Sequence, residues 1–126
     1  MLDDMIEQLK SELEIEIPTE VPGVWSLLLD DGETVTITSV PQGFYLECRF
    51  GSYPSQEQLA FFTHALHANL YCEGTEECVL GIDEDGKTLV LSQGVEKTVD
   101  YPAFKEILEK FINSIDFWRE EALSFV

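Results

Sequence analysis

The sequence has 126 residues, a net charge of −18 and a hydrophobic fraction of 44 %. This length allows one domain with a hydrophobic core, and the hydrophobic fraction is too high for a disordered chain. The excess of acidic residues disfavours nucleic acids and anionic membranes as partners, because both are bound mainly through cationic groups. We therefore expect a single folded domain over residues 1–126.

The sequence also indicates where the protein works. The first twenty residues carry seven acidic groups and one lysine, whereas a signal peptide starts with basic residues and continues with an apolar stretch. No apolar run approaches the ~20 residues that cross a bilayer. Three irregularly spaced cysteines do not form a disulfide framework and suit a reducing compartment. These features predict a cytoplasmic protein.

The chain should begin with an amphipathic helix that ends before Pro18. Its apolar residues recur every three or four positions, as expected for one buried helical face: Leu2, Met5, Ile6, Leu9 and Leu13. Two further apolar residues, Ile15 and Ile17, extend beyond this stripe.

Three segments with strand character follow, over residues 24–29, 34–38 and 44–50, and turn sequences rich in Asp, Pro and Gly separate them. The second and third alternate between apolar and polar side chains, so each should bury one face. The first differs, because Trp25 and Leu27 alternate with Val24 and Leu28 and both of its faces are apolar. These segments predict an antiparallel meander.

The second half adds a helix, a hairpin and a last helix. A capping box at Ser55 to Gln58 predicts a helix to about Tyr71, and a glycine-ended turn joins segments 78–82 and 88–91. Asp100 should cap a helix that runs towards Glu121. The predicted fold is α+β, a twisted antiparallel sheet of about five strands with three helices in the order α-β-β-β-α-β-β-α.

Residues suited to chemistry are few. His64, His67, Cys72 and Cys78 are conceivable zinc ligands, but their spacing is looser than that of zinc motifs. The Asp-rich turns lack calcium ligands at the EF-hand positions, and acidic neighbours of the cysteines oppose thiolate formation. We therefore expect no enzyme, no metal and no cofactor, and a small metal-binding protein is the least favoured alternative.

The order of elements, the acidity, the segment Leu80-Gly81-Ile82-Asp83 and the ending Phe117-Trp118-Arg119 resemble one family. It is the class I chaperones of bacterial type III secretion systems, which includes the chaperone of the translocated intimin receptor. The resemblance implies a homodimer in the bacterial cytoplasm that binds the non-globular N-terminal region of a secreted effector and keeps it competent for secretion. The alternative that we keep is an acidic α+β regulatory adaptor that binds a cytosolic protein.

The resemblance also implies two sets of contact residues. The dimer interface would use the second helix and the following strand, at Phe62, Leu66, Val79, Leu80 and Ile82. Effector contacts would use apolar residues of the first helix and the neighbouring strands, at Leu9, Leu13, Ile15, Ile17, Trp25, Leu27, Leu29, Val35 and Ile37. The strand that is apolar on both faces gives a physical reason, because its second face could take an extended segment by strand addition or in side-chain pockets.

Overall fold

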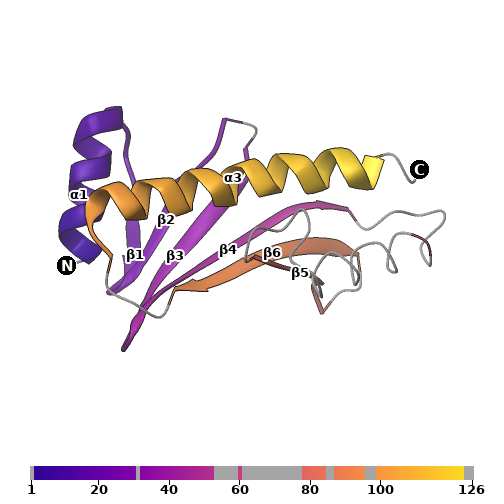
Figure 1. The fold of residues 1–126 in the computed structure, drawn as a ribbon, viewed down its shortest axis with the longest axis horizontal. Helices are drawn as coiled ribbons and strands as arrows, with labels where there is room; N and C mark the ends of the chain where they lie inside the picture. Colours follow the sequence, from indigo (N-terminus) through magenta and orange to yellow (C-terminus); the bar gives the residue numbers. More distant parts are fainter. Residues whose placement is uncertain are drawn as a thin grey trace.

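The computed structural model of the chain describes residues 2–30, 32–52, 60, 78–84, 87–95 and 99–123. Its elements in chain order are helix α1 (Leu2–Leu13), strands β1 (Thr19–Val21), β2 (Val24–Leu28), β3 (Thr34–Val40), β4 (Gly43–Ser52), β5 (Val79–Ile82) and β6 (Thr88–Val95), and helix α3 (Tyr101–Leu123). The strands form one antiparallel sheet in the order β1-β2-β3-β4-β6-β5. Helix α3 lies across one face of this sheet, and α1 packs beside the start of α3 (Figure 1).

The α+β class and the antiparallel sheet agree with the prediction, but the predicted elements and their order are wrong. Within the described residues the order is α-β-β-β-β-β-β-α, with six strands rather than about five and two helices rather than three. The unpredicted strand is β1, which is only three residues long and lies between Pro18 and Pro22. It is too short for alternation to be visible, and its place at the sheet edge tolerates flanking prolines. The helix predicted from Ser55 to Tyr71 lies outside the described residues apart from residue 60.

The alternating pattern of the strands sets the inner face of the sheet. Val35 of β3 lies opposite Cys48 of β4, which lies opposite Leu91 of β6, which in turn lies opposite Leu80 of β5. All four side chains are buried. Because side chains alternate along a strand, about every second residue of each strand points to this same face of the sheet. The sheet thus presents one continuous apolar face to the helices.

Helix α3 covers this face through a stripe of large apolar side chains. Its start is fixed by Asp100, whose carboxylate accepts a hydrogen bond from the backbone N–H of Ala103 at 3.0 Å, as the capping prediction requires. Phe104 packs edge-to-face on Phe44 of β4, with ring centroids 5.5 Å apart. Trp118, near the other end of the helix, has no exposed surface. The core therefore extends along almost the whole helix.

Charged pairs connect the rim of this core. Arg119 near the end of α3 pairs with Glu33 of the turn between β2 and β3, and Arg49 of β4 pairs with Asp83 at 3.0 Å. In the turn between β2 and β3, Gly32 has a φ of +96°, which favours glycine, so the predicted turn is present. These contacts fix the hairpin turns relative to the helix and the central strands.

Candidate functional site

Most of the residues predicted to contact an effector lie in the core of the single chain. They belong to the same hydrophobic cluster as Phe111 and Trp118 of α3. The almost fully buried members are Leu9, Ile17, Trp25, Leu27, Val35 and Ile37. Because α1, α3 and the sheet enclose this cluster, the accessible part of the predicted contact surface must come from the remaining positions.

The remaining predicted positions lie at the ends of α1 and β2. Leu13 is 49 % exposed, whereas Ile15 and Leu29 are partly buried against the core. Two exposed apolar residues that were not predicted lie close to them in sequence. Leu28 is 68 % exposed and Val21 is 54 % exposed. The sequence pattern of β2, with apolar residues on both faces, already indicated that Leu28 would lie on the second face. Val21 lies in β1, the strand that the sequence patterns did not predict.

The end of α1 has a defined backbone geometry. The N–H of Ile15 donates to the carbonyl of Lys10 at 3.1 Å, and Glu14 between them has a φ of +55°. A left-handed residue after the last turn, closed by such a bond, is a common way to end a helix. The bond directs Ile15 back towards the core and leaves Leu13 on the surface.

A polar cluster joins this end of α1 to the start of α3. The carboxylate of Glu12 accepts hydrogen bonds from the Lys105 ammonium and from the Tyr101 hydroxyl, the latter at 2.7 Å. The bond from Lys105, followed by the bond from Tyr101, holds the pKa of Glu12 below its ordinary value. Burial, followed by the bond to Glu12, raises the pKa of Tyr101 to about 12. The cluster thus favours an ionised Glu12 and a neutral Tyr101.

The residues predicted for a dimer interface are only partly within the described chain. Phe62 and Leu66 lie outside the described residues. Val79 and Ile82 are exposed on β5, whereas Leu80 between them is only 6 % exposed and faces the core. Strand β5 lies at one edge of the sheet, as β1 does at the other. An edge strand with exposed apolar side chains is a surface suited to pairing with another chain.

The face of the sheet opposite α3 carries little charge. In strands β2 to β6 as described, its only carboxylate and its only cation are those of Glu47 and Arg49. Its other outward side chains are small, β-branched, aliphatic or aromatic: Val24, Ser26, Leu28, Thr34, Thr36, Thr38, Val40, Tyr45, Val90, Ser92 and Val79. Among the described surfaces of this chain of net charge −18, this face therefore repels a negatively charged polypeptide less than the exposed acidic sides of α1 and α3 do.

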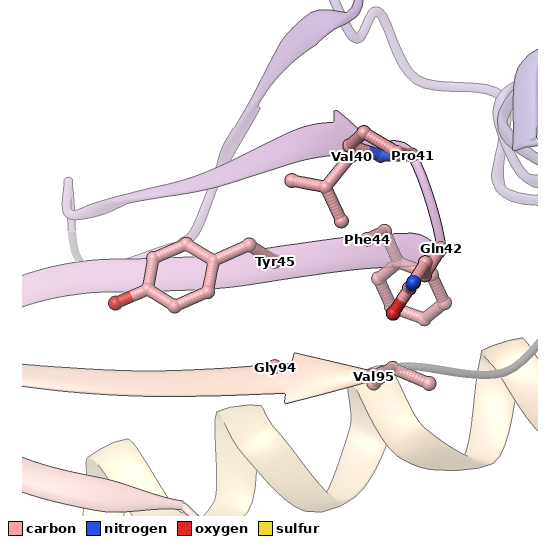
Figure 2. A pocket seen from close by; sticks show the side chains of 7 residues that line it. All are labelled: Val40, Pro41, Gln42, Phe44, Tyr45, Gly94 and Val95. Atoms are coloured by element: carbon pink, nitrogen blue, oxygen red, sulfur yellow. The ribbon is translucent and has the colours of Figure 1, made fainter.

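One end of this face is hollowed. A shallow cavity of about 410 Å³ lies at the turn between β3 and β4, beside the end of β6. Figure 2 shows the Tyr45 ring extending along β4 next to Val40, with Gly94 on the neighbouring strand. A Cβ atom at Gly94 would lie 3.9 Å from the Tyr45 ring, an ordinary van der Waals distance, so the ring lies close to this strand. The lining is largely apolar and can accept an aliphatic or aromatic side chain.

The structure offers little chemistry beyond these surfaces. Cys48 and Cys78 are buried, and the Cys78 thiol donates to the side-chain carbonyl of Gln93 at 3.4 Å. No group of three metal-binding side chains occurs within the described part of the chain. His64, His67 and Cys72 lie outside that part. None of the described helices is long and apolar enough to cross a membrane.

Comparison with known proteins decides the family. The model of the Tir chaperone protein (CesT) family matches residues 4–119, which is almost the whole chain. The chain belongs to this family. The predicted resemblance is thereby confirmed, and the family is one of type III secretion chaperones rather than of enzymes. No curated protein matches the chain.

Solved structures share the fold of this family member. The structure of the ExsC–ExsE complex matches with a TM-score of 0.77 and 14 % identity, and covers 94 % of this chain and 91 % of the other. The HopA1–SchA chaperone–effector complex matches with a TM-score of 0.72 and 16 % identity over 94 % and 93 % of the two chains. YbjN from E. coli, a putative transcription regulator, matches with a TM-score of 0.60 and 20 % identity over 96 % and 90 %. At these identities the likeness concerns the fold alone.

The residues that carried the resemblance have structural roles in this chaperone-family chain. Trp118 fills the core, and its neighbour Arg119 pairs with Asp116 at 3.1 Å as well as with Glu33. In the other segment, the N–H of Asp83 donates to the Thr88 carbonyl at 2.8 Å and closes the hairpin of β5 and β6. In this chain these residues therefore act by stabilising the fold.

Proposed function

We propose that this chain is a chaperone of the bacterial cytoplasm that binds the extended N-terminal region of a secreted effector and keeps it competent for export, without catalysing a reaction. The match to the Tir chaperone protein family over residues 4–119 carries the proposal. A related fold in the HopA1–SchA chaperone–effector complex supports it. Binding an extended polypeptide needs apolar surface and free strand edges rather than catalytic groups.

The proposed effector surface combines the exposed apolar residues at the end of α1 with those of strands β1 and β2. Leu13, Val21 and Leu28 supply accessible side chains, and Ile15 and Leu29 supply partly buried ones. The edge of β1 offers a place for strand addition, which gives affinity through backbone bonds and tolerates varied sequences. The buried members of the predicted set, such as Trp25 and Leu27, would support this surface from within the core.

We further propose that the chaperone is a homodimer whose interface includes β5. Val79 is 56 % exposed and Ile82 is also exposed, on a strand at the sheet edge. Leu80 would act indirectly by holding β5 on the core, because its side chain is buried. The predicted contribution of Phe62 and Leu66 remains part of this proposal, although both lie outside the described residues.

The decisive experiment is purification of the tagged protein from its own bacterium, with mass spectrometry and limited proteolysis of the bound material. We expect a secreted protein in about equal amount, with a protease-resistant segment near its N-terminus. Deletion of the chaperone gene should then reduce export of that protein, and wild-type chaperone should restore it. The matched variant Leu13→Asp should restore export less well, because it places a charge on the proposed contact surface.

The same experiment separates the alternatives. Recovery of a folded cytosolic regulator in place of an exported protein would favour the regulatory adaptor. The fold likeness to YbjN, a putative transcription regulator, makes this the alternative to test first. Elemental analysis of the purified protein for stoichiometric zinc would test the least favoured alternative, a metal-binding protein.

A further inference from the structure

Glu12 lies in the last turn of α1, where a carboxylate disfavours its own helix because it adds negative charge at the negative end of the helix dipole. Its partners are in α3, which begins at Tyr101. There the same carboxylate lies beside the positive end of a helix dipole and is bound by Tyr101 and Lys105. The favourable contacts of Glu12 are therefore between the two helices.

This contact is placed next to the accessible end of α1. Leu13 directly follows Glu12 and is 49 % exposed. Two residues later Ile15 is held against the core by its backbone bond to Lys10. The two bonds of Glu12 to Tyr101 and Lys105 join the last turn of α1 to the first turns of α3. Leu13 is thus placed between two constraints, the side-chain bonds of Glu12 and the backbone bond of Ile15.

We propose that Glu12, bound by Lys105 and Tyr101, is a positioning residue that orients Leu13 and Ile15 for contact with the effector segment. The inference rests on the proposed chaperone function and deepens it. Burial of Ile6 and Leu9 keeps α1 folded on the core, and an exposed ion pair contributes little to stability. Loss of the cluster should therefore leave the fold intact and shift only the end of α1.

The test compares two lysine variants of the same helix. Lys105→Met removes a partner of Glu12, whereas Lys110→Met removes the partner of Glu106, which lies 3.3 Å away within α3. Both change the net charge equally and keep an aliphatic side chain. The binding probe is a fluorescein-labelled peptide copied from the protease-resistant segment of the recovered effector. We expect Lys105→Met to weaken its binding about tenfold, and Lys110→Met to leave it within about twofold of wild type.

A charge exchange distinguishes positioning from general loss of structure. The double variant Glu12→Lys with Lys105→Glu restores an ion pair at the same place, and we expect it to recover affinity to within about threefold of wild type. Hydrogen exchange gives a readout that needs no partner. The amides of residues 13–17 should exchange about tenfold faster in Lys105→Met and at the wild-type rate in Lys110→Met.

The outcomes are distinct. Equal affinity and equal exchange in the two lysine variants would overturn the positioning role, and so would a large fall in melting temperature that occurs only in Lys105→Met and accounts for its weaker binding. If wild-type protein binds no exported segment, the proposed function fails. Hydrogen exchange in that case still decides whether Glu12 holds the end of α1.

Discussion

Leu9 and Leu13 lie one helical turn apart in α1 but have different surroundings. Leu9 is 2 % exposed and belongs to the hydrophobic core, whereas Leu13 is about half exposed at the helix end. Both were predicted to contact an effector, but the structure leaves only one of them accessible. Only Leu13 can touch a partner directly, while Leu9 can influence binding through the fold.

Alanine substitutions should separate these two roles. Leu9→Ala removes buried methyl groups and should lower the free energy of unfolding by about 2–5 kcal/mol. Leu13→Ala should change it by no more than about 0.5 kcal/mol, because the side chain is largely in water already. Urea denaturation followed by circular dichroism measures both values. Equal losses for the two variants would contradict the assignment of Leu13 to the surface.

The neutral form of Tyr101 is favoured by its burial and by its bond to ionised Glu12. The folded protein therefore holds this proton more tightly than the unfolded chain, with a pKa of about 12 against an ordinary value of 10.0. The stabilisation is complete below the ordinary value and is lost as the pH rises towards the raised one. The free energy of unfolding of wild-type protein should fall more than that of Tyr101→Phe between about pH 9 and about pH 11.5.

Absorbance of the phenolate group provides the control for this residue. Difference spectra of wild type and Tyr101→Phe should show one tyrosine that ionises only near pH 12. The ionisation that wild type shows and Tyr101→Phe lacks belongs to Tyr101. If it occurs near the ordinary tyrosine pKa, the bond between Tyr101 and Glu12 is absent in solution.

At the scale of elements, β1 and β5 are the two edge strands of the described sheet. Among the described strands, β1 pairs only with β2, and β5 pairs only with β6. Edge strands with apolar side chains tend to pair with other chains unless they are protected. The proposed function therefore uses β1 for the effector and β5 for a second copy of the chain, and the exposed Val79 and Ile82 beside the buried Leu80 support the proposed use of β5.

The variant Val79→Asp tests the assignment of β5. Burying an unpaired carboxylate in an interface is costly, so we expect monomers at micromolar concentration by light scattering. Val40→Asp is the matched control, because Val40 is also exposed but lies in β3, at the turn into β4. It should leave the dimer intact. Dimers of unchanged stability in Val79→Asp would exclude this residue from the interface.

At the scale of the whole molecule, charge is distributed unevenly over the two sides of the sheet. The exposed residues of α1 and α3 include many acids, such as Asp3, Glu7, Glu109 and Glu120. On the opposite face of the sheet, the only charged side chains in the described strands β2 to β6 are Glu47 and Arg49. Two chains with a net charge of −18 each repel one another at long range, whichever surfaces they finally bury.

Salt should therefore strengthen a homodimer of this protein. Raising the ionic strength from about 0.02 M to about 0.3 M shortens the screening length from roughly 20 Å to roughly 6 Å and weakens the repulsion. Sedimentation equilibrium at the two ionic strengths should give a dissociation constant several-fold lower at the higher one. A dimer that weakens with salt would show that ion pairs between the chains dominate its interface.

The sequence alone determined features that depend on neighbouring residues. Alternation along β3 and β4 identified the buried faces, and the turn at Gly32 and the cap at Asp100 were predicted from local backbone chemistry. The family resemblance also came from contiguous segments, one of which ends in Trp118 and Arg119. Each of these signals lies within a few residues, where periodicity and turn propensity are reliable.

Only the tertiary structure decided which apolar residues remain accessible. Periodicity placed Leu9 and Leu13 on one stripe and gave β2 two apolar faces. It could not reveal that Leu9 is buried while Leu13 is half exposed, or that Trp25 faces the core while Leu28 is exposed. Strand β1 was missed because three residues between prolines carry no measurable period. The cluster at Glu12 joins residues 89 and 93 positions apart. Such contacts depend on how the helices pack over the sheet, which no local pattern encodes.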